Sequence, residues 1–434
     1  MLVVNGESHP KRSSEEPSGL SHPLRVETIG IRGFRSIRDA SFHPGPVSAL
    51  IGGPATGKSN ILAALRMVLD PTSPGPQPGD IPEENPTDTL IRVETGTGST
   101  VTLEGTPPST EITRTGELPV ALYLPARLRS GRVVAGTSSR PPQAEKARRL
   151  ICVGAHFDAL GEASDAEHHG STEAAHGLVE GVEAWTSAGI SGLILLIEEP
   201  ELYLPPQTQR HLYRLLRDLA AVGNQILYST HSPSFLNVTR LNELVLTEHR
   251  GRAGTRLFQP EPLATSDEFR ANSEFDASRS ELFLGRAAIL VEGLTEKLAL
   301  PFVFQSLGYD PDRERISIVE CGGKANIPLV ARVATAAGVP FVVLHDRDAP
   351  AGRKPNRAEQ GLNRLIAEAA GNENRVMLTP DFEGVVGLRA GHSKPAHAWR
   401  RIAATPPQDL PGSLVHLVER VVTLAKEGEP TMPP

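Results

Sequence analysis

Residues 52–59 have the G-x-x-x-x-G-K-S spacing of a phosphate-binding loop. An apolar run precedes them and a helix-like run follows, which is the strand–loop–helix setting that this motif requires. The glycines let backbone N–H groups close around the β- and γ-phosphates, the lysine reaches the same phosphates, and the serine hydroxyl ligates Mg²⁺. This setting disfavours the alternative of a chance match in a glycine-rich turn, so the segment predicts binding of a nucleoside triphosphate. The residues expected to bind the nucleotide are Gly52, Gly53, Pro54, Ala55, Thr56, Gly57, Lys58, Ser59 and Asn60, with Ser59 also a Mg²⁺ ligand.

A pair of adjacent glutamates follows a second apolar run, residues 193–197, as expected for a strand buried on both faces. Glu198 is expected to hold Mg²⁺, directly or through water, and Glu199 to orient the attacking water. The alternative is a helix start, in which Pro200 occupies the first turn and the acids face the helix dipole. His231 follows the next predicted strand, where its ring can touch the γ-phosphate.

Acidic residues or a glycine-rich turn follow three predicted strands in the last third of the chain. The first strand ends in an E-x-x-x-E spacing, the second near Gly-Gly-Lys at 322–324, and the third in a D-x-D pair. The carboxyl ends of parallel strands share one edge of a sheet, so these groups should meet there. Crowded carboxylates repel unless cations neutralise them, and hard oxygen ligands select Mg²⁺ or Mn²⁺. Two such ions about 4 Å apart can hold the attacking and leaving oxygens of a phosphodiester. The alternative interpretation is that the acids merely cap strand ends. The candidate ligands are Glu292, Glu296, Asp346 and Asp348.

The hydrophobic pattern predicts an α/β chain with a P-loop ATPase domain followed by a smaller, mostly parallel sheet. Residues 90–140 are expected to add strands beside the nucleotide sheet, and residues 143–189 to be mostly helical. A hairpin is expected at 243–258. The predicted divisions are a disordered leader at 1–22, an ATPase domain at 23–258, a linker at 259–284, a second domain at 285–402, and a tail at 403–434 with one helix.

Composition restricts the function further. Aromatic residues make up 4% of the chain, which disfavours a wide base-stacking surface. Two distant cysteines predict neither a disulfide scaffold nor a cysteine-rich zinc site. The absence of a long apolar run and of a hydrophobic signal core predicts a cytoplasmic protein with no membrane contact.

The formal net charge is −7, so any binding to DNA must use local basic patches. Charge clusters of this kind also occur as plain solvated faces. The first patch comprises Arg127, Arg129, Arg132, Arg140, Lys146, Arg148 and Arg149. The second patch, Arg353, Lys354 and Arg357, begins five residues after Asp348. It should therefore lie beside the metals and contact a phosphate backbone without reading sequence.

The first half of the chain resembles the ATP-binding-cassette ATPases of the RecF and SMC type. The resemblance is carried by Ile-Arg-Gly-Phe-Arg-Ser at 31–36, Glu-Glu-Pro-Glu at 198–201 and Ser-Thr-His-Ser at 229–232. It implies Glu199 as the hydrolytic base and His231 as the switch histidine. It also implies a homodimer through the ATPase domains, with two nucleotides held between two cassettes. The signature segment would be the degenerate Gly-Ser-Thr-Glu at 170–173, and no glutamine after the phosphate loop is assigned.

The acidic strand ends resemble a Toprim domain. Together with the cassette, they make residues 24–400 similar to the overcoming-lysogenization-defect (OLD) family of ATP-powered nucleases. The resemblance implies that the four candidate acids bind metal. It also implies Glu383 as a late metal-binding acid and Lys394 as a lysine that stabilises the transition state. An endonuclease in phage defence or DNA processing is the implied function.

Other classes of protein fit this sequence less well. The five tyrosines all fall in predicted cassette or sheet elements, which leaves no strand-passage domain for a topoisomerase. A primase would need a polymerising core, and a transport ATPase would need a membrane segment or coupling helix. The main rival is an ATP-gated DNA clamp or sensor without nuclease activity. The residues leave open DNA against RNA, nicking against double-strand cleavage, the effect of ATP, and any helicase or other defence partner.

Overall fold

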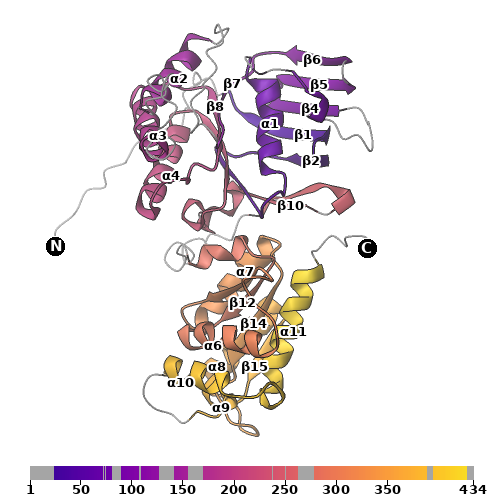
Figure 1. The fold of residues 1–434 in the computed structure, drawn as a ribbon, viewed down its shortest axis with the longest axis vertical. Coiled ribbons are helices and arrows are strands. Elements are labelled where there is room, and N and C mark those ends of the chain that lie inside the picture. Colours follow the sequence, from indigo (N-terminus) through magenta and orange to yellow (C-terminus); the bar gives the residue numbers. More distant parts are fainter. Residues whose placement is uncertain are drawn as a thin grey trace, which may run out of the picture.

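The computed structural model describes residues 24–71, 73, 75–80, 89–106, 109–126, 141–154, 170–236, 238–249, 251–261, 278–388 and 394–427. In Figure 1 the phosphate-loop domain lies above a second domain that carries the acidic residues. The predicted leader and most of the predicted linker lie outside the described residues. Across the described residues, no helix combines the length and apolarity needed to cross a bilayer.

A six-stranded sheet carries the predicted nucleotide machinery. Its strand order is β11-β10-β3-β9-β8-β7, with parallel pairing except between β10 and β11. Every residue of β3 and β9 is buried, the polar ones included, because helices or a second sheet cover both faces. The strands are β3 (Val47–Ile51), β7 (Val120–Leu124), β8 (Leu193–Glu198), β9 (Gln225–Thr230), β10 (Leu244–His249) and β11 (Thr255–Phe258).

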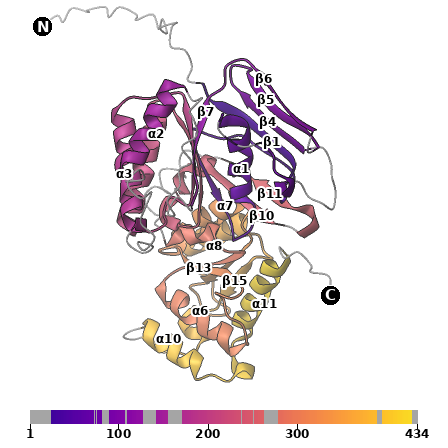
Figure 2. The ribbon, with the colours of Figure 1, turned by 45° about the horizontal axis from the view of Figure 1, so that its top comes forward.

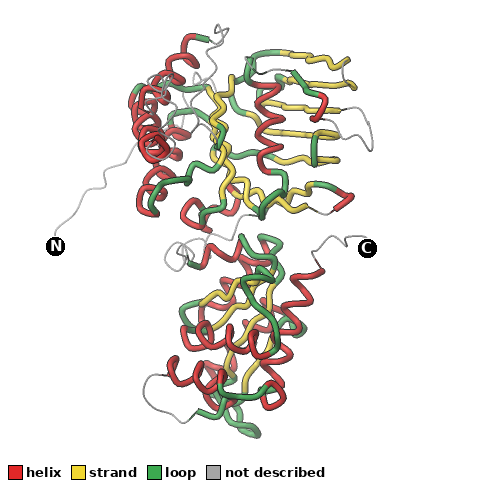
Figure 3. Tube along the Cα trace, in the orientation of Figure 1, coloured by secondary structure: helices red, strands yellow, loops and turns green. Residues whose placement is uncertain are grey.

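A separate antiparallel sheet has the order β2-β1-β4-β5-β6. Helix α1 (Lys58–Leu69), which follows the phosphate loop, lies between this sheet and the six-stranded one and contacts both (Figure 3). Of the strands expected at 90–140, only β7 joins the nucleotide sheet among the described residues. Strands β4 (Thr89–Thr95), β5 (Thr100–Thr106) and β6 (Ser109–Thr115) instead form the antiparallel layer, together with the earlier strands β1 (Val26–Phe34) and β2 (Ile37–Phe42).

Three helices cover the opposite face of the six-stranded sheet (Figure 2). They are α2 (Pro142–Gly154), α3 (Gly170–Ser187) and α4 (Pro206–Ala221). Trp185 of α3 is fully buried, and its indole N–H donates to the Ile190 carbonyl at 3.1 Å. This bond anchors the turn that leads into β8.

The second domain is a four-stranded parallel sheet in the order β13-β12-β14-β15. Helices α7 and α8 lie on one face, whereas α6, α10 and α11 pack on the other. Helix α11 was predicted to belong to a separate tail, yet its buried leucines and valines contact β12, β14 and β15. The strands are β12 (Ala287–Val291), β13 (Ile316–Glu320), β14 (Phe341–Asp346) and β15 (Arg375–Leu378). The helices are α6 (Leu294–Ser306), α7 (Ile327–Ala336), α8 (Arg357–Ala370), α9 (Phe382–Val385), α10 (Lys394–Ala403) and α11 (Gly412–Glu427).

The two domains share one continuous hydrophobic cluster. Leu282 and Phe283 of the short helix η5 (Arg279–Phe283) are buried in it, although the sequence predicted a linker here. On the other side of the interface, Phe258 of β11 packs on Gly338, where an added Cβ would lie 3.2 Å from the ring. This packing sets the acidic sheet against the phosphate-loop domain.

Candidate nucleotide and metal sites

The phosphate loop is held in shape from within and from β10. Gly52 and Gly57 have φ values of 149° and 102°, a region that favours glycine. A side chain at Gly52 would collide with the carbonyl oxygen of Thr247. The Thr247 hydroxyl bonds that of Thr56 at 2.7 Å, and the Thr56 hydroxyl donates to the Gly53 carbonyl at 3.0 Å. The loop is therefore braced by the strand beside it.

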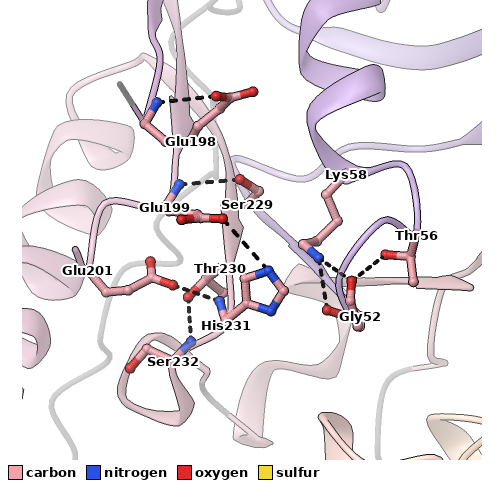
Figure 4. A network of polar contacts seen from close by, with 12 residues as sticks. Gly52, Thr56, Lys58, Glu198, Glu199, Glu201, Ser229, Thr230, His231 and Ser232 are labelled. Carbon is pink, nitrogen blue, oxygen red and sulfur yellow. Dashed lines mark hydrogen bonds and ion pairs between the residues drawn. The ribbon is translucent and has the colours of Figure 1, made fainter. Parts of the chain in front are cut away.

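The Lys58 ammonium lies inside this loop and donates to the carbonyls of Gly52 and Gly53 at 2.8 and 2.7 Å (Figure 4). Burial lowers the pKa of Lys58 to about 8, although Glu199 and Glu201 act in the opposite direction. The phosphates of a bound nucleotide would pair with this desolvated cation.

Ser59 and Asn60, in the first turn of α1, have different surroundings. Ser59 is exposed at the helix start, where its hydroxyl is accessible to a nucleotide-bound Mg²⁺. Asn60 donates to the Ser36 hydroxyl at 2.8 Å and accepts from Arg35 at 3.2 Å, and Arg35 also pairs with Asp80 at 2.9 Å. The described contacts of Asn60 tie the β1–β2 turn to α1.

The two adjacent glutamates at the end of β8 point to different sides. Glu198 accepts a hydrogen bond from the backbone N–H of Ala126 at 3.2 Å. Glu199 has a left-handed φ of 44°, and its N–H bonds the Ser229 carbonyl at 2.9 Å. This costly backbone places its carboxylate 3.8 Å from the His231 ring (Figure 4). The predicted base and switch histidine are thus neighbours, across from Lys58.

Glu201 is a site residue to which the sequence analysis gave no role. It is 8% exposed, and its carboxylate accepts a hydrogen bond from the His231 N–H at 2.7 Å. Its second oxygen is buried without a partner in the structure, and burial raises the pKa of Glu201. The sequence feature that points to Glu201 is its place as the third acid of the Glu-Glu-Pro-Glu run at 198–201. Burial also lowers the pKa of His231 below its usual 6.5, so the ring is neutral at pH 7.

The acidic edge of the second sheet brings Glu292 and Asp346 together. The Asp346 N–H donates to Glu292 at 2.7 Å, while the Asp346 Oδ1 atom is buried with no hydrogen-bond partner among the described residues. Burial, together with the neighbouring carboxylates, raises the pKa of Glu292 to about 7 and that of Asp346 to about 8. Glu296 accepts from the Gly293 N–H at 3.2 Å, and its pKa is also raised by burial. A desolvated set of hard oxygen donors with too little positive charge fits a divalent cation.

Lys324 supplies the positive charge that this edge contains. Its ammonium forms an ion pair with Asp348, donates to the Asp346 carbonyl at 2.7 Å, and pairs with Glu359 at 2.9 Å. In the part of the chain that the structure describes, no three acids or histidines converge closely enough to hold a metal as they stand. In this arrangement Asp348 is paired with Lys324, so a metal bound by Asp348 would compete with that ion pair. In the sequence, the only trace of this lysine is the Gly-Gly-Lys turn at 322–324, which predicts no role for it.

The remaining predicted site residues are placed less completely. Glu383 lies on α9, near enough to Glu296 to raise the pKa of that carboxyl. Lys394 begins α10, but its side chain lies outside the described residues. The degenerate signature at 170–173 forms the first turn of α3, and its side chains also lie outside them.

The two basic patches differ in exposure and pairing. Four arginines of the first patch lie outside the described residues, at 127–140. Its Arg148 and Arg149 pair with Glu145 at 2.8 and 3.2 Å. The second patch is exposed along its whole length, just beyond Asp348. It is the better placed of the two to contact a phosphate backbone near the acidic edge.

Family models match three parts of the chain. Residues 283–348 match the model "Overcoming lysogenization defect protein-like, TOPRIM domain", and residues 186–236 match "AAA ATPase domain". Residues 24–75 match a family of unknown function. The fold and these matches define a P-loop ATPase domain followed by a smaller Toprim domain, in the predicted order.

Among curated proteins, the chain is 35% identical to the OLD nuclease of Thermus scotoductus over 268 residues, covering 56% of this chain and 51% of that protein. It is 29% identical to the Old nuclease of Escherichia phage P2 over 164 residues, covering 36% of this chain and 28% of the other. The chain therefore spans about half or less of these relatives. The predicted resemblance to the OLD family is confirmed.

Solved structures with similar parts include the SMC head domain of Thermotoga maritima. It is 15% identical with a TM-score of 0.35, covering 55% of this chain and 99% of that one. The C-terminal region of the Burkholderia pseudomallei OLD protein is 19% identical with a TM-score of 0.28, covering 33% of this chain and 100% of that one.

Proposed function

We propose that this protein is an ATP-hydrolysing, metal-dependent DNA endonuclease that cleaves phosphodiesters at the Toprim edge with two divalent cations. The observation that carries the proposal is the Glu292–Asp346 pair. It comprises two desolvated carboxylates, one with an unpartnered oxygen, at a parallel-sheet edge in a chain that also has a complete phosphate loop. At neutral pH the carboxylates at such an edge repel one another unless a cation neutralises them.

In the ATPase domain, Lys58 and the loop N–H groups would hold the β- and γ-phosphates, while Ser59 and Glu198 would bind Mg²⁺. Glu199 would accept the proton of the attacking water, because its carboxylate lies 3.8 Å from the switch residue His231. Glu201 would hold the His231 backbone in place through the 2.7 Å hydrogen bond. ATP is the proposed nucleotide.

In the Toprim domain, the four acids Glu292, Glu296, Asp346 and Asp348 would bind Mg²⁺ or Mn²⁺, joined by Glu383. The cations would supply charge neutralisation of the scissile phosphate. The exposed patch at 353–357 would bind the DNA backbone, and Lys394 would stabilise charge in the transition state. Homodimerisation through the ATPase domains, a cytoplasmic location and a role in phage defence are further proposals, supported by the resemblance to SMC-type heads and OLD nucleases.

The test is cleavage of supercoiled plasmid, linear duplex, single-stranded DNA and RNA, with Mg²⁺ or Mn²⁺ and with or without ATP. We expect wild type to cleave DNA and Asp346→Ala to be inactive at equal loading. Glu373→Ala, which removes an exposed acid of the same domain, is the matched control and should cleave like wild type.

A second function, an ATP-gated DNA clamp without nuclease activity, is favoured by two observations. Lys324 already neutralises Asp348, and no three described acids converge. Equal DNA cleavage by wild type and Asp346→Ala, with ATP-dependent DNA retention in both, would replace the nuclease proposal with the clamp.

A further inference from the structure

An arginine of the Toprim domain reaches the phosphate loop of the ATPase domain. Arg315 comes directly before β13, and a Cβ added to Gly53 would lie 2.5 and 2.7 Å from its two terminal guanidinium nitrogens. The guanidinium therefore packs on the second glycine of the loop, 262 residues away in the sequence (315 minus 53).

The backbone at Arg315 is in a strained conformation. Arg315 has a left-handed φ of 57°, which costs free energy for a residue with a side chain. Its carbonyl accepts from the Arg286 N–H at 2.7 Å, and its N–H bonds the Asp312 carbonyl at 3.1 Å. These bonds hold the residue in the unusual conformation, which directs its side chain toward the other domain.

The guanidinium lines a cleft of about 940 Å³ between the domains. One wall is the phosphate loop, residues 52–56, with the β10–β11 hairpin; the other includes residues 283–286, Arg315 and residues 337–340. The cleft is large enough for a nucleotide-sized ligand, and the phosphate loop forms part of its wall.

The charges near Arg315 indicate an anion. Its cation contributes to lowering the pKa of both Lys58 and His231, so the three groups act on one another across the phosphate loop. Among the described residues Arg315 forms no ion pair, and its side chain bonds the Leu284 carbonyl at a long 3.5 Å. A guanidinium with unused donors, close to a P-loop lysine, is suited to bind phosphate oxygens.

We propose that Arg315 binds the β- and γ-phosphates of the nucleotide from within the same chain, so that one ligand contacts both domains. The proposal rests on ATP binding by the phosphate loop, as proposed above. It assigns the nucleotide site a ligand-binding residue that lies outside the ATPase domain.

The proposal gives nucleotide binding a short path to the acidic edge. Arg315 precedes the five-residue strand β13, and Lys324 lies in the turn that follows this strand. Strand β13 is at the edge of its sheet and pairs with β12 alone among the described strands. A shift of Arg315 toward phosphate would move β13 and, with it, the lysine that pairs with Asp348.

The test uses full-length Arg315→Met, which keeps much of the apolar length of the side chain but removes the charge. Arg315→Lys restores a cation with different geometry. Arg313→Ala is the matched control, because Arg313 is an exposed arginine in the same turn. Equilibrium affinities for ATP and ADP are measured by titration calorimetry at two salt concentrations, with thermal melting as the folding check.

We expect Arg315→Met to weaken ATP binding by about 10- to 100-fold, the loss of a charge-assisted hydrogen bond or two. Arg315→Lys should recover part of this, and Arg313→Ala should match wild type. The salt dependence of ATP affinity should also fall in Arg315→Met. Wild-type affinity in a stably folded Arg315→Met protein would overturn the proposal and leave Arg315 as an interface residue.

A second readout separates the coupling from nucleotide binding. The ratio of cleavage rates with and without saturating ATP should approach one in Arg315→Met, compared with wild type and Arg313→Ala. If wild type binds no ATP, the phosphate-loop assignment fails. If wild type binds ATP but cleaves nothing, the nuclease proposal fails, and the affinity comparison still decides the role of Arg315.

Discussion

The carboxylate of Glu201 accepts a hydrogen bond from the backbone N–H of His231 at 2.7 Å, although thirty residues separate the two in the chain. Because the bond is made to the main chain, it fixes the backbone position from which the His231 side chain extends. The adjacent Ser232 hydroxyl bonds Gln209 at 2.5 Å, which holds the same turn from the other side.

Loss of the Glu201 acceptor should impair turnover more than nucleotide binding. Glu201→Ala leaves the partly buried His231 N–H without this acceptor, which costs about 1 kcal/mol of folding stability. We expect at least a tenfold lower kcat for ATP hydrolysis, roughly the effect of a misplaced catalytic group, with little change in ATP affinity. Glu201→Gln retains an acceptor oxygen and should stay close to wild type. Equal turnover in Glu201→Ala and wild type would show that the His231 position does not depend on this bond.

Hydrolysis should depend on Glu199 more than on Glu198. Glu199→Gln keeps the side-chain shape but removes the base that lies 3.8 Å from His231. We expect retained ATP binding, trapped dimers in light scattering, and little phosphate release. Glu198→Gln is the comparison, since its carboxylate bonds the Ala126 N–H instead. Normal turnover in Glu199→Gln, with loss in Glu198→Gln, would reverse the assignment.

ATP affinity should fall as the pH rises above 8. Burial lowers the pKa of Lys58 to about 8, so the free protein begins to lose this positive charge at that pH. Because the protonated ammonium binds phosphate, affinity should drop by up to about tenfold per pH unit above the pKa, until the pKa of the bound state is reached. The measurement is a nucleotide titration from pH 7.5 to 9.5, where ATP itself stays fully ionised. Lys58→Ala should bind weakly at every pH, and a flat profile for wild type would contradict the prediction.

The acidic edge should destabilise the metal-free protein as the pH rises. Burial raises the pKa of Asp346 to about 8, so the folded state favours the protonated acid. A raised carboxyl pKa gives stability that is complete at low pH and is lost as the pH rises toward 8. Asp346→Asn should therefore gain melting temperature over wild type, by an amount that grows between about pH 5 and 8.

Divalent cations provide the second comparison for this site. Mg²⁺ or Mn²⁺ should raise the melting temperature of wild type at pH 8, because a bound cation stabilises the ionised carboxylates. The same ions should have little effect on Asp346→Asn, whereas Glu373→Ala should respond like wild type. A metal-induced shift of equal size in Asp346→Asn and wild type would exclude Asp346 as a ligand.

The sequence by itself determined the features that a contiguous segment encodes. The phosphate loop needs glycines, a lysine and a serine at fixed spacing, and its strand and helix appear as apolar runs on either side. The acids after β12 and β14 could be placed on one edge for a similar reason, because parallel strands end together. The predicted parallel strands and the β10–β11 hairpin were found accordingly.

The tertiary structure alone decided which distant residues meet. Gly53 packs on Arg315, Lys324 pairs with Asp348, and helix α11 completes the Toprim core instead of standing apart. None of these contacts has a local signature, since an exposed arginine and one that reaches another domain look alike in sequence. They follow from how the domains pack through the shared hydrophobic cluster, and that packing is a property of the whole chain.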